Sequence, residues 1–443
     1  MGIRLSDHFT YKKLLRFVLP SIAMMVFISV YGVVDGFFVS NFAGKTSFAA
    51  INLVMPFVML LGGIGFMVGT GGTALVSKVL GEGDREKANR YFSMMVFLTL
   101  LLGVLLTAVG IAAMEPVARF LGATDAMIAD SVLYGRIVVG FTTAFMLQNV
   151  FQSFLIAAEK PKLGLLATIA AGLTNILLDA LFVGGFGWGV AGAAIATGIS
   201  QCVGGLLPLF YFLRPNDSLL RLVRTKPELA PLVKACTNGS SELMSSISSS
   251  VVSMVYNFQL LKYIGEDGVS AYGVLMYVQF IFVAIYIGYS VGCAPVIGYH
   301  YGAGNRDELK NLLRKSAGII AVAGVAMLTS SELLAEPLAK IFVGYDAGLL
   351  ALTTHGMKLY CISFILSGFN IFGSAFFTAL NNGTVSAAIS FLRTLLFQVV
   401  SILTLPLIIG VDGIWLAVVA AEAMALVCTG GFVVRGRKRY GYL

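Results

Sequence analysis

The chain has 443 residues, of which 58% are hydrophobic and only 12% are charged, and its formal net charge is +8. Soluble domains usually carry about 25% charged residues, so this composition excludes an ordinary water-soluble protein. The positive residues are scattered over short loops, which argues against nucleic acid as a partner. The apolar runs last about 20 residues or more, the length of a membrane-spanning helix, whereas barrel strands would read as short alternating segments. We therefore expect an all-α integral membrane protein.

Taken in chain order, the long apolar stretches predict twelve transmembrane helices. Several exceed the length of about 20 residues that a bilayer requires, so these are expected to tilt or to extend beyond the membrane. The predicted spans are 17–41, 48–80, 88–113, 126–158, 161–184, 190–213, 236–262, 268–301, 312–330, 347–380, 384–409 and 412–434.

Lysine and arginine residues in the predicted loops set the expected orientation. With the amino terminus inside the cell, 23 of the 30 lysine and arginine residues lie on the cytoplasmic side, and 4 lie in outer loops. Positive residues concentrate on the cytoplasmic side of membrane proteins. We therefore expect both termini in the cytoplasm. The charged start runs directly into a long apolar span, so no cleavable signal peptide is expected.

An internal repeat with an offset of 221 residues divides the chain into two halves. The segment GEGDRE at 81–86 recurs as GAGNRD at 302–307, and Phe151 recurs as Phe372. Each half holds six predicted spans, an even number, so both halves start on the same side of the membrane and the repeats are parallel. The expected domains are an amino-terminal six-helix lobe at 1–213, a cytoplasmic linker at 214–235 and a carboxy-terminal six-helix lobe at 236–443.

The sequence carries no signature of an enzyme, a metal centre or a bound cofactor. No P-loop is present, and the three histidines, His8, His300 and His355, are dispersed near the loops. The five cysteines are far apart and form no CxxC pair, so no disulfide framework is expected. If a membrane protein of this kind moves a solute without ATP hydrolysis, the energy must come from an ion gradient or from the solute's own gradient.

Acidic residues inside predicted spans are functional candidates because an ionisable group is costly there. Asp35 lies in span 17–41, and Asp179 lies in span 161–184, four residues after Asn175 and on the same helix face. We expect these three residues to converge on one pocket of the first half. Burial favours the protonated carboxyl, so the acids can exchange protons, and the same oxygens can instead hold Na⁺. The alternative is a structural hydrogen bond between helices.

The second half lacks these acids. At the offset of 221 residues, Asp35 corresponds to Tyr256, Asn175 to Leu396 and Asp179 to Val400. The predicted helices are therefore kept without the carboxyl groups, which favours a site-specific role for the acids of the first half.

A polar helix face in span 236–262 is a second candidate. Glu242 begins this face, and Ser246 and Ser249 continue it at helical spacing. The face can line a wet cavity, or Glu242 can lie near the cytoplasmic surface, where a charge costs little.

Two more ionisable residues lie in the last two spans. Glu422 can merely pair with Arg393 or with Lys358. Whether Glu242, Arg393 and Glu422 face a cavity does not follow from the sequence.

Aromatic and methionine residues occur at positions compatible with an apolar, adaptable binding cavity. Such soft side chains suit a promiscuous pocket, although each can equally serve helix packing or lipid contact. These residues are Tyr31, Met55, Met59, Tyr256, Met276, Phe280 and Tyr286.

On these motifs the chain resembles the MATE (multidrug and toxin extrusion) family, and most closely the bacterial branch of MepA-type and DNA-damage-inducible-type exporters. The resemblance rests on VDGFFVS at 34–40, NILLD at 175–179 and AEKPKL at 158–163, together with the repeated glycine-rich segment. It covers nearly the whole chain. The resemblance implies a MATE-like fold of the MOP superfamily, and Pro20 matches a proline that bends the family's first helix.

The resemblance also implies a function. It implies a secondary antiporter of the bacterial cytoplasmic membrane that exports cationic amphiphilic drugs, dyes and toxins by alternating access, in exchange for H⁺ or Na⁺. In that branch the coupling residues match Asp35, Asn175 and Asp179, and Glu242 is roughly at the place of an acid found in other branches. A monomer is plausible. The alternative is a lipid-linked oligosaccharide flippase of the same superfamily, although those chains usually have extra spans and more basic residues in the cavity.

Overall fold

A computed structural model describes residues 3–42 and 45–442, apart from the side chains of residues 33, 36–42, 45, 46 and 48. Every regular element among the described residues is helical. The elements are α1 (Tyr11–Phe42), α2 (Lys45–Gly81), α3 (Arg85–Phe120), α4 (Ile128–Gly140), α5 (Thr142–Ala157), α6 (Pro161–Asp179), the π-helical turn η1 (Ala180–Gly185), α7 (Gly189–Leu213), α8 (Leu229–Tyr263), α9 (Glu266–Gly302), α10 (Arg306–Val343), α11 (Ala347–Cys361), α12 (Phe364–Ala379), α13 (Gly383–Phe391), the π-helical turn η2 (Leu392–Leu396), α14 (Phe397–Ile409) and α15 (Asp412–Tyr440).

Most of these helices are long and apolar enough to cross a membrane. Within the described part of the chain, nine helices meet this condition singly, and eleven spans result when each of two bent helix pairs counts as one. Helix α8 is also long, at 35 residues, but it is not among them. The run of serine residues in α8 lowers its hydropathy, because each hydroxyl adds a polar group to an otherwise apolar helix.

Two predicted spans are broken rather than continuous. The span predicted at 126–158 consists of α4 and α5, which meet at an angle of 53°, and the span predicted at 347–380 consists of α11 and α12, which meet at 48°. The two breaks occupy comparable places in the two halves. Apolar periodicity does not reveal such bends, because both arms of a bent span are equally hydrophobic.

The linker predicted at 214–235 is shorter in the structure, because α8 already begins at Leu229. Pro231 lies in the first turn of α8, where a backbone N–H has no helical partner, so the proline does not interrupt the helix. The remaining linker is held against α3: the Arg85 Nη2 donates to the Ser218 carbonyl at 2.9 Å, and the Val223 N–H donates to the Ser93 hydroxyl at 2.8 Å.

The repeated glycine-rich segments have the same physical role in both halves. Gly83 and Gly304 have positive φ angles of 87° and 67°, which glycine adopts without strain. The next residue in each case caps a helix: Asp84 accepts from the Lys87 N–H, and Asn305 accepts from the Glu308 N–H. The repeat found in the sequence is therefore a turn followed by a helix start.

The offset of 221 residues is not constant along the chain. Glu159 and Asn381 are the two non-glycine residues with positive φ among the described residues, and they occupy the same turn at an offset of 222. The π-helical turn η2, which precedes Val400 in the same span, contains one more residue than a regular α-helical turn, so the offset between the halves increases there. The counterpart of Asp179 consequently falls between Val400 and Ile402, and no acid lies there.

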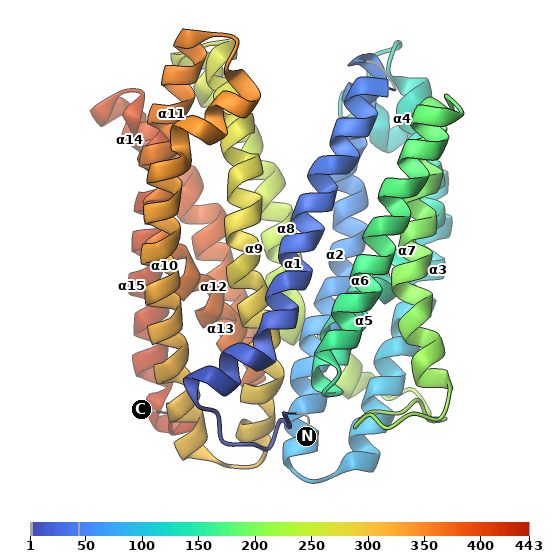
Figure 1. The fold of residues 1–443 in the computed structure, drawn as a ribbon. Helices are drawn as coiled ribbons and strands as arrows, with labels where there is room; N and C mark the ends of the chain where they lie inside the picture. The colour runs from blue at the N-terminus through green and yellow to red at the C-terminus, as the bar shows by residue number, and fades with distance from the viewer. Residues whose placement is uncertain (1–2, 43–44, 443) are drawn as a thin grey trace.

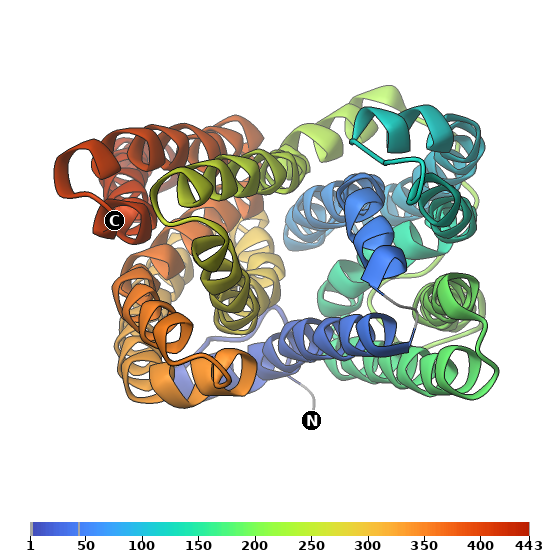
Figure 2. The same cartoon turned by 90° about the horizontal axis from the view of Figure 1, so that it is seen from above.

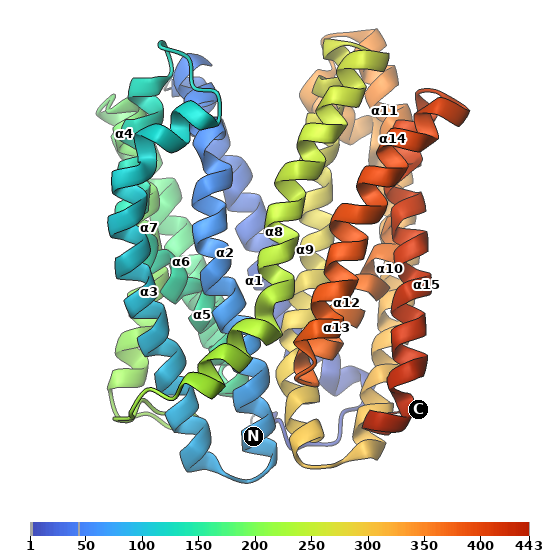
Figure 3. The ribbon, with the colours of Figure 1, turned by 180° about the vertical axis from the view of Figure 1, so that it is seen from behind.

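The helices form two bundles, the N-lobe (α1–α7) and the C-lobe (α8–α15). Figures 1 and 3 show the lobes side by side, meeting at the end that carries both termini and diverging toward the opposite end. Helices α1 and α8 each begin beside the other lobe and cross to their own, along opposite edges of the molecule (Figure 2). Helices α1 and α8 therefore each contact both lobes.

Glycines allow the helices of the two lobes to touch closely at the end that carries the termini. A Cβ added at Gly81 would stand 1.9 Å from the Tyr299 carbonyl oxygen, and one added at Gly302 would stand 1.9 Å from the Lys78 carbonyl oxygen. These two contacts are related by the 221-residue repeat, so they lie about a pseudo-two-fold axis. Only glycine permits such an approach of two helix backbones.

Candidate functional site

The N-lobe brings Asp35 of α1 together with Asn175 and Asp179 of α6. The Asp35 carboxyl group interacts with the side chains of both Asn175 and Asp179. Asp179 is fully buried, Asn175 is 2% exposed, and Asp35 is half-buried. The three residues, whose spans lie in the same half of the sequence, therefore come together in the folded chain, because α1 packs directly against α6.

The polar atoms of this group lack protein partners. Both carboxyl oxygens of Asp179, one oxygen of Asp35 and the Asn175 amide nitrogen are buried without a hydrogen-bond partner among the described residues. A structural hydrogen bond would satisfy these atoms, since unsatisfied buried polar groups are costly. No basic side chain interacts with the two acids in the described part of the chain. The arrangement can bind a proton or a small cation between carboxyl and amide oxygens.

Two tyrosines form the walls of this acid site. Tyr31, predicted as a cavity residue, interacts electrostatically with Asp35. Tyr134 of α4 is buried and interacts with both Asp35 and Asp179. Sequence reasoning did not identify Tyr134. Its only signal is a phenol hydroxyl inside an apolar span, which is too common to single out.

A π-helical turn follows the acid site directly. Asp179 is the last residue of α6, and η1 continues the same span from Ala180. A π-turn contains an extra residue and is often found at functional sites. It shifts the helix face after Asp179, so that the backbone around the carboxyl group departs from the regular α-helical ladder.

The serine face of α8 satisfies much of its own hydrogen bonding. The Ser246 hydroxyl donates to the Glu242 carbonyl at 3.0 Å, and the Ser249 hydroxyl donates to the Ser245 carbonyl at 2.8 Å. Such back-bonding allows serine to lie in a membrane helix without any other partner. Ser246 also faces α2, where its Oγ would lie 3.2 Å from a Cβ added at Gly63. This face therefore lies at the contact between the lobes.

In the C-lobe the membrane-embedded residues Arg393 and Glu422 form an ion pair. The Arg393 Nε of η2 donates to both carboxyl oxygens of Glu422 in α15, at 2.8 and 3.0 Å. The Asn370 amide donates to Glu422 Oε2 at 2.7 Å and accepts from the Thr429 hydroxyl at 2.9 Å. The Arg393 side chain is 16% exposed and that of Glu422 is 2% exposed. Of the two partners that the sequence allows for Glu422, the structure thus selects Arg393.

The remaining aromatic and methionine candidates fall into two groups. Tyr256 is buried in the C-lobe core with its ring stacked on Tyr272 at 4.6 Å, and the Tyr286 hydroxyl donates to the Phe364 carbonyl, so neither side chain faces an open space. The other group reaches the surface or its margin, since Met59 and Phe280 are exposed and Met55 and Met276 are partly buried against the lobe cores.

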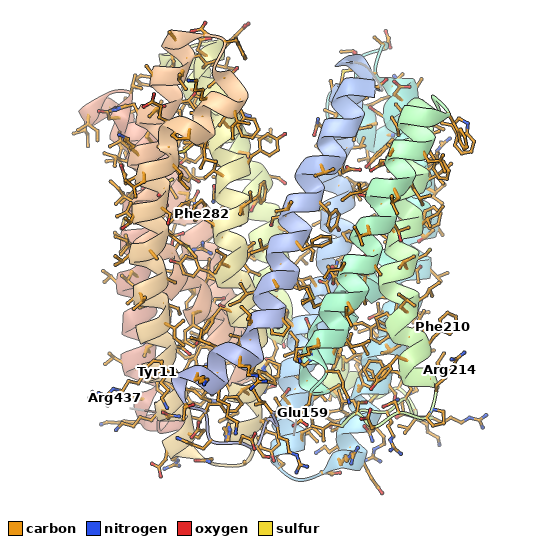
Figure 4. The ribbon with its side chains drawn as sticks, viewed as in Figure 1. Tyr11, Glu159, Phe210, Arg214, Phe282 and Arg437 are labelled. Carbon is orange, nitrogen blue, oxygen red and sulfur yellow. The ribbon has the colours of Figure 1, made fainter. Side chains whose placement is uncertain are left out.

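The first residues of the chain, 3–10, form an N-terminal strap beneath both lobes. The Leu5 N–H donates to Glu159 of the N-lobe at 2.6 Å, and the Phe9 N–H donates to Glu308 of the C-lobe at 2.9 Å. His8 Nδ1 lies 2.6 Å from the second Glu308 oxygen. Figure 4 shows Glu159 at the end that carries the termini.

The surroundings of Glu159 differ from those of an exposed carboxyl. Burial raises the pKa of Glu159 above its ordinary value, and the hydrogen bond from the Leu5 backbone opposes part of this rise. The strap therefore covers a carboxyl that lies at the junction of the lobes.

Comparisons with known proteins agree with this architecture. The model of the MatE family matches twice, at residues 20–181 and 243–403, once in each half of the chain. The multidrug export protein MepA of Staphylococcus saprophyticus is 26% identical over 385 residues, covering 86% of this chain and 84% of that protein. The MepA protein of Staphylococcus aureus strain NCTC 8325 is 24% identical over 420 residues, covering 94% and 92%.

Solved structures share the fold. The crystal structure of a MATE protein in complex with MaL6 superimposes with a TM-score of 0.92 at 23% identity and covers 98% of this chain and 97% of its own. An outward-facing multidrug resistance MATE family transporter of the MOP superfamily superimposes with a TM-score of 0.91 at the same identity and coverage. The expected all-α membrane fold with two parallel six-helix repeats is confirmed.

Proposed function

Since this chain belongs to the MatE family, we propose that it is a multi-pass bacterial membrane transporter that exports small amphiphilic molecules in exchange for a cation. The curated relatives that it matches over most of its length are multidrug export proteins. The exported compounds are cationic drugs, dyes and toxins, and the exchanged cation is H⁺ or Na⁺.

The observation that carries this proposal is the pair of acids in the N-lobe, which has no basic partner among the residues that the structure describes. Asp35 and Asp179 lie side by side, and both oxygens of Asp179 are buried without a donor from those residues. Two carboxylates in this position are stable only when a cation or a proton neutralises part of their charge. Cation binding therefore has a large influence on the free energy of the N-lobe, as coupling requires.

The arrangement of the lobes supports alternating access. The lobes touch through glycine contacts at the end with the termini and diverge at the other (Figure 1). We place the termini in the cytoplasm, so this conformation faces outward. A cation that binds one orientation better than the other shifts the equilibrium between them, and an exported molecule that prefers the opposite orientation completes the exchange.

The inward-facing conformation requires the contacts at the cytoplasmic end to break. These contacts include the Gly81 and Gly302 crossings and the N-terminal strap, which reaches from Glu159 to Glu308. Because the strap is held by a few hydrogen bonds, each contributing about 1 kcal/mol, it can open without unfolding either lobe.

The test is efflux of a fluorescent cationic dye from cells that express the protein, with a proton or a sodium gradient imposed in turn. Wild-type protein should export the dye on one of the two gradients, and Asp35→Asn and Asp179→Asn should not. The matched control is Asp125→Asn, which makes the same chemical change at an exposed position of the N-lobe.

Normal efflux by both acid variants at normal expression would overturn the coupling role. No efflux by folded wild-type protein on either gradient would overturn drug export and leave the lipid-linked oligosaccharide flippase as the function to examine next.

A further inference from the structure

The side of the N-lobe that faces away from the C-lobe carries an open pocket, where α7 ends and the linker begins. The pocket has a volume of about 770 Å³, and residues between positions 207 and 217 line it. Figure 4 shows two of them, Phe210 and Arg214, near the end that carries the termini. Because α7 is long and apolar enough to span a membrane, the pocket lies where its lipid-facing surface meets the polar end of the lobe.

One wall of the pocket is apolar and lies along the last turns of α7. Leu207 and Phe210 are 49% and 55% exposed, and they share a helix face with Arg214 because the spacings are three and four residues. The exposed face of a membrane-spanning helix contacts acyl chains. One turn farther along this face, the side chains change from apolar to a guanidinium group. A phospholipid has the same order of groups, with acyl chains followed by a phosphate.

The free charge in the pocket is positive. The Arg214 side chain is exposed, and its guanidinium group has no hydrogen bond or ion pair within the part of the chain that the structure describes. The other charged residue of the lining, Asp217, accepts from Lys160 Nζ at 2.9 Å, which offsets its negative charge. A guanidinium group matches the geometry of phosphate oxygens, which it binds with two parallel hydrogen bonds.

The polar end of the pocket is already formed by a turn that folds back on α7. Pro215 has no N–H group and ends the helix. The Asn216 amide donates to the carbonyl groups of Tyr211 and Arg214, at 3.2 and 3.0 Å, and its oxygen accepts from the Ser218 N–H at 3.1 Å. A ligand that binds here does not have to order the turn, which lowers the free-energy cost of binding.

We propose that this pocket binds an anionic phospholipid from the leaflet at the end that carries the termini. The phosphate lies at Arg214, and one acyl chain lies along Leu207 and Phe210. Anionic lipids attract basic residues next to a membrane span, and this pocket adds an apolar wall and a preformed turn to that attraction. The site does not depend on which compound the protein exports. A lipid bound there also contacts the start of the linker that joins the lobes.

The affinity of the site is tested on purified protein in detergent, by native mass spectrometry with phosphatidylglycerol, phosphatidylcholine and soluble glycerol phosphate. Wild-type protein should retain phosphatidylglycerol in preference to the other two. Arg214→Gln should weaken this binding by about tenfold, since a charge-assisted hydrogen-bond pair is lost, and Arg214→Lys should keep part of the preference. The matched control is Arg90→Gln, at an exposed arginine near the start of α3, and it should change binding by less than about twofold.

The location of the lipid is tested in vesicles of phosphatidylcholine that contain a rising fraction of brominated phosphatidylglycerol. Phe210→Trp places a fluorophore in the apolar wall, and the signal of wild-type protein, which has two tryptophans, is subtracted. Bromine quenches tryptophan only at close range. The added fluorescence should be quenched at a lower lipid fraction in Phe210→Trp than in the Phe210→Trp/Arg214→Gln double variant.

Three results would overturn the lipid site. Equal weakening by Arg214→Gln and Arg90→Gln would show that phosphatidylglycerol is held only by the overall positive charge. Equal quenching with and without Arg214 would place the bound lipid elsewhere. Binding of soluble glycerol phosphate that is as strong as binding of phosphatidylglycerol would show that the pocket takes free phosphate compounds and that its apolar wall has no role.

Discussion

The two lobes share one fold and differ in how they treat buried charge. In the N-lobe, Asp35 and Asp179 face each other, and within the described part of the chain no basic residue interacts with them and the Asp179 oxygens have no donor. In the C-lobe, Glu422 has Arg393 and Asn370 as partners and is satisfied. A carboxyl group without a partner responds to protons and cations, whereas one held in an ion pair does not. Under the proposed function, ion coupling falls to the N-lobe, and the C-lobe keeps a fixed ion pair.

The two sites also differ in depth. Asp179 is the last of the 19 residues of α6, and Arg393 follows the start of the corresponding span, at Gly383, by only ten residues. At a rise of about 1.5 Å per residue, the C-lobe site lies about 12 Å closer to the end with the termini. The two sites therefore lie at different levels along the two bundles.

The largest effect expected from this comparison is on transport. Asp179→Asn should reduce cation-driven dye efflux to the level of cells that lack the protein, because the remaining Asp35 has no second carboxyl with which to share a cation. Glu422→Gln should retain efflux of a purely cationic dye. Equal loss of efflux in the two variants would contradict the division of roles between the lobes.

The second largest expected effect is a loss of protein stability, and it should arise from a substitution in the C-lobe. Glu422→Gln leaves the Arg393 charge without its buried partner and should destabilise the protein by about 3–5 kcal/mol, seen as a lower melting temperature in detergent. Asp179→Asn should not lower the melting temperature, since it removes an unsatisfied acid. Glu336→Gln, at an exposed position of α10, is the control.

A smaller effect concerns the contact that both lobes share. Gly302→Ala would place a Cβ 1.9 Å from the Lys78 carbonyl oxygen, so the helices must separate at a cost of about 1–3 kcal/mol. Spin-label distances across the end that carries the termini should broaden or lengthen in this variant. Gly273→Ala on the same helix has no atom within 4 Å of the added carbon and should leave the distances unchanged.

Loss of the Glu308 carboxyl should weaken the attachment of the N-terminal strap to the C-lobe by about 1–3 kcal/mol. Glu308→Ala removes the acceptor of the Phe9 N–H and the partner of His8, so the C-lobe end of the strap should open. Hydrogen–deuterium exchange of residues 3–10 should become faster. Asp307→Ala, the exposed neighbour, is the control, and equal exchange in the two variants would show that Glu308 does not hold the strap.

The smallest effect is expected at Tyr134. Tyr134→Phe keeps the ring and removes a hydroxyl beside both acids, which should change the cation concentration for half-maximal efflux by about fivefold, or about 1 kcal/mol. Tyr345→Phe, at an exposed residue, should not change it. An unchanged value for Tyr134→Phe would limit the acid site to Asp35, Asn175 and Asp179.

Much of the fold could be predicted because the bilayer imposes simple rules. Long apolar runs, charged loops and the repeat predicted the helical class and the two halves, and the spacing of Asn175 and Asp179 predicted a shared helix face. The sequence did not predict the bends between α4 and α5 and between α11 and α12, or the early start of α8 at Leu229. Bends and helix ends depend on neighbouring helices more than on local hydropathy.

What the sequence by itself determined was which groups are available: a membrane-embedded helical chain, two acids in the first half and one arginine near one acid at the end of the second. The tertiary structure decided which of these groups meet. It brought Tyr134 to the acid site and buried Tyr256 in the C-lobe core. It also paired Glu422 with Arg393 and not with Lys358. The physical reason is that hydropathy is a local property of the chain, whereas the partner of a buried charge depends on which helices pack together.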